Sequence, residues 1–233
     1  MRLAIIIILD KYIEDSNVEI TFSNGLTRMH IKELLFFKDM ELPDYLKLFY
    51  EQTNGLMIDS EYLLDDLDDP MHLLINSCEN LSFTTKKVNF LPDKRFILFA
   101  SNDENTTYLL DMKNLDPNSN PLIVMTNPVY KTYIPLTNSV DVFLECACLG
   151  VLGLIEMYSE EFTLNYSSIP KRMVEKKNRI LRCLKDLFTT AKREYELLDL
   201  WQLDPKTKQL VQISVAKWFK EIKRLLTLFK KIG

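Results

Sequence analysis

The stretch IKELLFFKDMELPDYLKLFYEQTNG, residues 31–55, predicts two short amphipathic helices separated by a proline. Its apolar residues recur every three or four positions, as on one face of a helix. Thr27 can cap the first helix, which should end at Leu42, because Pro43 disfavours the helical conformation of the residue before it. Pro43 suits the first turn of the second helix. This helix should end at Asn54-Gly55, since both residues tolerate the positive φ of a helix C-terminus.

The pattern changes after this helical pair. Short runs rich in β-branched and aromatic residues are separated by polar turns, which indicates strands of a mainly antiparallel sheet. The predicted strands are Met71–Ile75, Arg95–Ala100, Thr107–Met112, Leu122–Thr126 and Val129–Ile134. Phe96–Phe99 has no polar face and therefore predicts a central strand covered on both sides. Ser101–Asn105 predicts a hairpin connection.

Helical periodicity returns in the last third of the chain. Ser139 is a candidate N-cap of a helix whose apolar stripe continues to Tyr158. Pro170 opens a second helix with an inward stripe from Ile180 to Leu198. A third helix near Ser214–Lys231 sets apolar residues opposite lysines and arginines. Each stripe needs a surface to pack against, since amphipathic helices gain most of their stability from packing.

At the N-terminus, residues 2–14 are assigned to a helix, although their β-branched residues also suit a strand. No small-residue cleavage site follows the apolar run, which argues against a secretory signal. Helices, then strands, then helices predict an α+β fold rather than a βαβ repeat. We expect a central, mainly antiparallel sheet flanked by helices, with a C-terminal helical extension.

Charge divides the chain into two parts. Residues 1–160 hold 25 Asp/Glu and 12 Lys/Arg, a net charge of -13, and residues 161–233 hold 8 and 17, a net charge of +9. We therefore expect an acidic domain at 1–160 and a basic helical extension at 161–233 packed on it. The two parts either attract one another or each meet an outside partner of opposite charge, and the sequence favours neither.

The motifs Ile31–Leu34, Leu42–Tyr50 and Asn54-Gly55 resemble, in this order, the opening of the SUKH superfamily of Smi/Knr-like domains. Two later pairs of motifs extend the resemblance over about residues 1–155: Arg95–Ala100 with Tyr108–Asp111, and Pro128–Tyr130 with Ser139–Leu144. The resemblance implies an α+β domain that acts as a binding module. Many bacterial members look like immunity proteins that neutralise a polymorphic toxin, often a nuclease, whereas eukaryotic and viral relatives act as adaptors or regulators.

The sequence offers little for catalysis, and we expect no catalytic, cofactor or metal site. Five glycines cannot supply the common nucleotide-binding loops. His30 and His72 are not paired with a Ser or Cys in a nucleophile motif, and a structural role is favoured for both. The cysteines are interpreted as reduced, buried thiols of a cytoplasmic protein, namely Cys78, Cys146, Cys148 and Cys183.

Acidic loops are the candidate binding surface. The candidate partner-binding residues are Glu61, Asp65, Asp66, Asp68, Asp69, Asp103 and Glu104. A solvated turn is the alternative interpretation of the run of aspartates. The functional interpretation is an acidic patch that meets a cognate toxin, or another protein with a basic surface, and occludes its active site.

A second hypothesis is an adaptor or regulator that binds another protein or a membrane through the basic C-terminal helices. Membrane docking is disfavoured, because the apolar face of the last helix can pack on the preceding helix. Nucleic acid is not expected as a partner, because the rest of the chain is acidic and repels phosphate.

Overall fold

The computed structural model describes residues 9–62, 71–84, 91, 95–102, 106–127, 129, 131–161, 169–198 and 205–232. Its strands are β1 (Val18–Phe22), β2 (Leu56–Ser60), β3 (Met71–Ile75), β4 (Ser82–Phe83), β5 (Phe96–Ser101), β6 (Thr107–Leu115), β7 (Pro121–Asn127) and β8 (Thr132–Thr137). Its helices are α2 (Arg28–Phe37), α3 (Asp44–Gln52), α4 (Val140–Cys148), α5 (Val151–Glu161), α6 (Lys171–Glu175), α7 (Lys177–Leu197) and α8 (Pro205–Lys231), with a 3₁₀ turn η1 at Cys78–Asn80.

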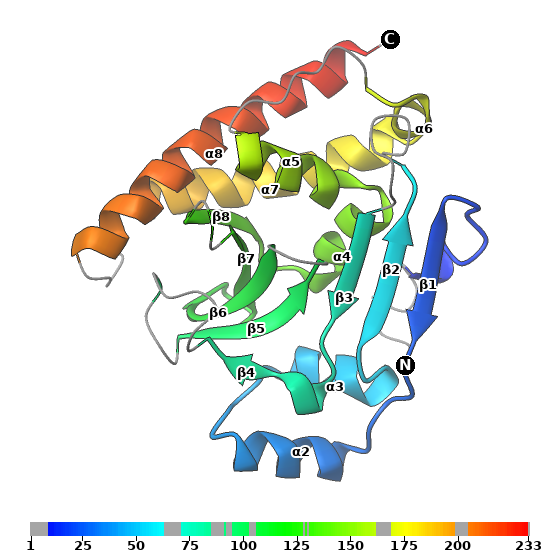
Figure 1. Ribbon diagram of the computed structural model, residues 1–233, viewed down its shortest axis with the longest axis vertical. Coiled ribbons are helices and arrows are strands. Elements are labelled where there is room, and N and C mark those ends of the chain that lie inside the picture. Colours follow the sequence, from blue (N-terminus) through cyan, green and yellow to red (C-terminus); the bar gives the residue numbers. More distant parts are fainter. Residues whose placement is uncertain are drawn as a thin grey trace.

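One antiparallel sheet organises the fold, with the strand order β1-β2-β3-β5-β6-β7-β8 and β4 paired to β5. Helices flank the sheet, so the predicted α+β class is confirmed. α7 and α8 run side by side along one end of the molecule, whereas α2 and α3 lie at the opposite end (Figure 1). β5 is the middle strand of the order and almost fully buried, as its lack of a polar face predicts.

The two helices of the opening stretch form, but the first is shorter than predicted. Thr27 caps α2 by accepting a hydrogen bond from the His30 N–H at 3.3 Å. α2 ends at Phe37 rather than Leu42, because Asp39 adopts a left-handed φ of 53° that no helix continues through. Pro43 therefore marks only the last position at which this helix could have ended. α3 begins directly after Pro43, as predicted.

The strand predictions are confirmed for β3, β5, β6 and β7 within a few residues at each end. β8 begins three residues later than predicted, because Lys131 adopts a φ of 50° and interrupts the extended backbone before it. β1 and β2 were not predicted. The predicted hairpin connection joins β5 to β6, which pair in antiparallel register up to Ser101 and Thr107.

The helices after the sheet begin and end at other residues than predicted. Ser139 caps α4 through the Val142 N–H at 3.3 Å, but the helix stops at Cys148 because Gly150 takes a φ of 69°, and α5 follows. Pro170 precedes α6, which is separated from α7 at Lys176. α8 begins at Pro205, nine residues before the predicted start at Ser214.

The N-terminal helix prediction is tested only in part. Residues 2–8 lie outside the described residues, and Leu9 and Asp10 are helical before a turn. In the described part of the chain, no helix combines the length and apolarity that crossing a membrane needs.

The main core lies between the sheet and the helices on its inner face. It includes Ile58 of β2, Phe99 of β5 and Phe143 of α4, together with Leu184 of α7 and Trp218 of α8. A smaller cluster on the other face packs Val211 and Val215 of α8 against β5–β8. The predicted stripe of α8 is therefore buried against α7 and the sheet. The division of the chain into domains at residue 160 stays a prediction.

The four cysteines are free and buried, in agreement with the prediction. Burial raises the pKa of the Cys78 thiol to about 11. Burial likewise raises the pKa values of Cys146 and Cys148 well above the ordinary thiol value. These thiols fill the core and are poor nucleophiles at neutral pH.

Candidate functional site

A row of polar side chains crosses the outer face of β1, β2 and β3. Glu19, Asp59 and His72 stand opposite one another in the register of the three strands. Side chains alternate between the two faces of a strand, and the residues next to these three are buried, apart from the half-buried Ile20. His72 Nδ1 lies 2.5 Å from Asp59 Oδ1, and its ring is 36% exposed. The pair therefore faces the solvent side of the sheet.

This row lines one side of a groove of about 410 Å³. The segment from Ile13 to Val18, which leads into β1, and Glu61 complete the lining. We call this cavity the acidic groove, because its lining includes the carboxylates Glu14, Asp15, Glu19, Asp59 and Glu61. Carboxylates from two chain segments, 14–19 and 59–61, thus converge on one concavity, where low-dielectric walls strengthen the negative field.

Asp15 is fixed at the wall of the acidic groove. It accepts a hydrogen bond from Tyr62 Oη at 2.7 Å and one from Lys176 Nζ at 2.9 Å. Burial alone would raise the pKa of Asp15, but these hydrogen bonds outweigh it and lower the pKa to about 2. Lys176 also lies over the Tyr62 ring, 5.8 Å from its centroid. The carboxylate therefore stays ionised and oriented at neutral pH.

Glu61 is the one predicted binding residue among those the structure describes, and it lies in the acidic groove. Arg172 of α6 donates to its carbonyl oxygen at 3.1 Å and places Nη1 3.6 Å from its carboxylate Oε2. Lys176 and Arg172 thus bring positive charge from the extension to the groove. Glu14 and Glu19 remain exposed to solvent.

The other predicted binding residues lie outside the described residues. These are Asp65, Asp66, Asp68, Asp69, Asp103 and Glu104. The sequence prediction missed Glu14, Asp15, Glu19, Asp59 and His72. Glu19 and Asp59 lie on β1 and β2, which were not recognised as strands, and His72, on the predicted strand β3, was given a structural role. The available signal was the alternation in VEITF (18–22), where Glu19 lies between the apolar residues Val18 and Ile20. LMIDS (56–60) shows no such alternation, because Asp59 follows three apolar residues and precedes a serine.

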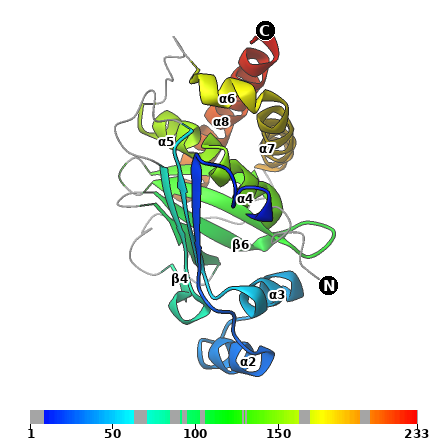
Figure 2. The same ribbon diagram turned by 90° about the vertical axis from the view of Figure 1, so that its right-hand side faces the viewer.

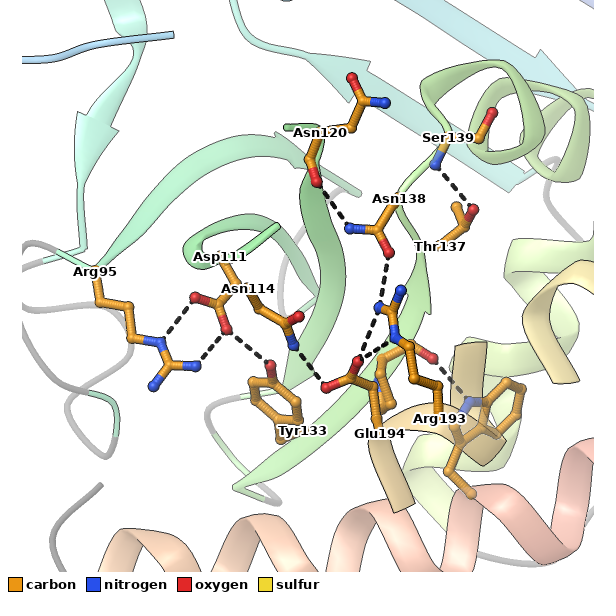
Figure 3. A network of polar contacts seen from close by, with 12 residues as sticks. Arg95, Asp111, Asn114, Asn120, Tyr133, Thr137, Asn138, Ser139, Arg193 and Glu194 are labelled. Atoms are coloured by element: carbon orange, nitrogen blue, oxygen red, sulfur yellow. Dashed lines mark hydrogen bonds and ion pairs between the residues drawn. The ribbon is translucent and has the colours of Figure 1, made fainter. Parts of the chain in front are cut away.

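A second polar cluster is buried between the sheet and α7 (Figure 3). Arg95 donates to both carboxylate oxygens of Asp111, at 2.7 and 2.6 Å. Glu194 of α7 accepts from Asn114 at 2.6 Å and from Arg193 at 2.9 Å. Burial raises the pKa of Glu194, although Arg193 and Asn114 act in the opposite sense. The carboxylates of Asp111 and Glu194 are fully buried, which indicates a structural contact.

Three further hydrogen bonds extend the polar contact between the C-terminal helices and the sheet region. Arg193 Nη2 donates to Asn138 Oδ1 at 2.8 Å, and Asn138 donates in turn to the Asn120 carbonyl at 2.9 Å. Trp218 Nε1 of α8 donates to the buried Pro135 carbonyl of β8 at 2.9 Å. Polar groups of the C-terminal helices therefore form hydrogen bonds with backbone carbonyl groups and polar side chains of the sheet region.

An apolar patch is exposed on α2, at the end of the molecule remote from α8 (Figure 1). Met29, Phe36 and Phe37 are 71%, 82% and 83% exposed. The two phenylalanine rings contact each other edge to face, with centroids 6.0 Å apart. Such a cluster of large exposed side chains is typical of an interaction surface.

Within the described residues, no group of three or more His, Cys, Asp or Glu side chains is placed to hold a metal ion. The carboxylates of the acidic groove instead make ion pairs with single cations or face solvent. His30 is exposed on α2, whereas His72 lies in the groove. The arrangement favours contact with a cationic group of a partner.

Comparison with known proteins identifies one family. The model of the SMI1 / KNR4 family (SUKH-1) matches residues 26–146, which are 121 of the 233 residues. No curated protein gives a significant match. The matched span contains Asp59, Glu61 and His72, whereas Glu14 to Glu19 and the whole basic extension lie outside it.

Proposed function

Because the chain belongs to the SMI1 / KNR4 family (SUKH-1), we propose that it is a protein-binding module and, more closely, an immunity protein that neutralises a polymorphic toxin. The family includes toxin immunity proteins. The acidic groove is the observation that carries the proposal. It offers two solvent-exposed carboxylates, Glu14 in the turn before the edge strand β1 and Glu19 on that strand.

The proposed mechanism is occlusion without chemistry. A toxin that cleaves nucleic acid needs a basic cleft for phosphates, and an acidic surface complements that cleft. Asp15 and Asp59 are held by Lys176 and His72, so the groove keeps its shape as the partner docks. The protein would act in the cytoplasm, where such a toxin would reach its substrate.

The test is co-expression with the catalytic domain of a large toxin encoded next to this chain. We expect growth to be restored and a stoichiometric complex to form in solution. The double variant Glu14→Lys/Glu19→Lys should slow association by about tenfold or more, with a weaker dependence on salt. The matched control Glu33→Lys/Glu41→Lys changes the same net charge at exposed sites of the α2 region.

An unchanged association rate of the groove variant would exclude the acidic groove as the docking surface. Failure of the unaltered chain to protect cells or to bind any neighbouring toxin would reject the immunity role itself.

The alternative is a regulatory or adaptor protein of the same fold that uses the basic C-terminal helices. Lys220 and Lys223 are exposed on α8. The apolar stripe of this helix, including Trp218 and Phe229, is buried, so its basic face is the one offered to a partner, apart from the exposed Ile213. Co-sedimentation with phosphatidylserine vesicles tests the membrane form of this function. Binding that Lys220→Glu/Lys223→Glu abolishes would favour it over immunity.

A further inference from the structure

β1 forms one end of the sheet. In the described part of the chain no strand pairs with its outer side. Figure 2, in which β1 is the dark-blue strand nearest the viewer, shows this edge in front of the other described segments. An open edge presents a row of backbone donors and acceptors to which another chain can bind.

The hydrogen-bond pattern identifies the residues that face outward. The Glu61 N–H donates to the Asn17 carbonyl at 2.9 Å, and the Ser23 N–H donates to the Gly55 carbonyl at 3.2 Å. In an antiparallel ladder the bonding direction alternates, so Glu19 and Thr21 also face β2, whereas Ile20 and Phe22 face away from it. The outward N–H of Val18 is already used by the Asp15 carbonyl at 3.0 Å.

The side chains along this edge indicate which kind of strand could bind there. Ile20 is half-buried and Phe22 is 39% exposed, so both offer apolar surface on the inner face at the end of the sheet. Glu19 and Thr21 are exposed on the outer face, beside the acidic groove. An added strand would therefore meet an apolar surface on one face and negative charge on the other.

A second copy of the chain fits this edge poorly. Two-fold pairing about Ile20 would set the two Glu19 carboxylates on diagonal positions, ~7–8 Å apart. It would also bring both acidic grooves to the same side of the joined sheet, and like charges in that arrangement repel. A basic partner is instead attracted by the negative field of the acidic groove.

We propose that β1 binds an extended, basic segment of the partner as an additional strand, with alternate lysine or arginine side chains against Glu19 and the acidic groove and apolar side chains over Ile20 and Phe22. This inference rests on the proposed function and names the segment that the partner must supply. Backbone pairing provides the affinity in such strand addition, and the alternating side chains provide the specificity.

The test uses the full chain and a capped, fluorescent peptide of alternating lysine and valine. Two derivatives are N-methylated, one at every lysine and the other at every valine. Only one of these sets can direct its N–H groups toward β1, because the direction alternates along a strand. We expect one derivative to lose binding by about tenfold or more and the other to keep it.

Two further measurements locate the contact. Hydrogen exchange of the Ile20 and Phe22 amides should slow when the peptide binds, whereas the Glu19 and Thr21 amides, which already bond to β2, should not change. Glu19→Lys should weaken binding by about tenfold, and the matched exposed control Glu33→Lys on α2 should not.

Equal effects of both methylated peptides, or protection of other amides instead, would overturn the inference. So would a concentration-dependent dimer, found by light scattering, that protects Ile20 and Phe22 without peptide. A chain that neutralises its toxin with no change in these two amides refutes only the edge inference. A chain that binds the peptide but protects against no neighbouring toxin refutes the immunity role.

Discussion

Replacing Trp218 by alanine tests whether the C-terminal helices and the sheet unfold as one unit. Trp218 lies on α8, is fully buried in the main core, and donates its indole N–H to the Pro135 carbonyl of β8 at 2.9 Å. Removing a buried tryptophan costs about 3–5 kcal/mol through lost transfer free energy and the cavity left behind. The orphaned carbonyl adds about 1 kcal/mol or more.

We therefore expect Trp218→Ala to lower the free energy of unfolding by about 4–6 kcal/mol. This loss approaches the whole stability of many domains, ~5–15 kcal/mol. Trp218→Phe keeps a large ring and loses the hydrogen bond, so it should cost about 1–2 kcal/mol. Lys220→Ala, on the exposed side of the same helix, should stay within about 0.5 kcal/mol.

The assay follows the buried cysteines one by one. Thiol labelling across a urea series, read by mass spectrometry, reports opening around Cys183 on α7 and around Cys78 beside α3. We expect both to become reactive at one midpoint, and Trp218→Ala to shift that midpoint for both. The reasoning would be refuted by Cys183 opening at lower urea while Cys78 keeps its wild-type midpoint, because the extension would then unfold by itself.

Three other substitutions have expected outcomes. Gly25→Ala should destabilise by about 1–3 kcal/mol in urea denaturation, because its Cβ would lie 2.2 Å from the Glu51 carbonyl oxygen; an unchanged midpoint would contradict this close approach. The pKa of Asp15 is lowered from 3.8 to about 2, so Asp15 contributes stability above pH 3.8 that is lost as the pH falls through 2. Asp15→Asn should cost about 1–2 kcal/mol at pH 7, after allowance for solvent screening, and should remove this acid dependence. Urea denaturation of both proteins at pH 7 and at low pH measures the difference. Glu194 has its pKa raised from 4.5, so the folded state holds its proton more tightly and stability falls as the pH rises above the ordinary value; Glu194→Gln should flatten that part of the stability curve, and an unaltered slope would show that another group titrates there.

The sequence was most informative where local rules act alone. The cap at Thr27, the proline before α3 and the cap at Ser139 each form from residues within a few positions of one another. The strands β3 and β5–β7 were recognisable because most of their residues are apolar. Such features need no knowledge of the fold.

Features that depend on partners distant in the chain were not predictable in this way. β1 and β2 carry a carboxylate at an alternate position because their outer face is open, and that makes them resemble loops. The break at Gly150 and the early end of α2 at Asp39 depend on left-handed backbone conformations. The helical period on either side gives no sign of them.

The acidic groove was predictable in part from composition and in part only from the folded structure. Composition indicated that negative charge gathers in the first part of the chain, and Glu61 was identified from it. The contact of Asp15 with Lys176 joins residues 161 positions apart, and only the folded chain brings them together. No local pattern could have assigned these two side chains to one site.

The charged residues of the acidic part (1–160) and of the basic extension (161–233) fall into two groups. Some cations of the extension pair with the acidic part: Lys176 with Asp15, Arg172 with Glu61, and Arg182 with Glu145. Other carboxylates of that part, Glu14 and Glu19, stay exposed at the acidic groove. The sequence left open whether the charges serve internal attraction or an outside partner, and these residues are consistent with both.

The position of the groove relative to the family match suggests where partner choice is encoded. The matched residues, 26–146, supply β2, β3 and the side chains Asp59 and His72. β1, Glu14, Glu19 and the α6 residue that reaches Glu61 come from outside the match. Segments outside the matched span thus complete the sheet, and they carry the exposed carboxylates Glu14 and Glu19 and the open backbone edge. If β1 binds a partner as proposed, substitutions of the exposed residues Glu19 and Thr21 should change that binding with little effect on the core, because neither side chain is buried.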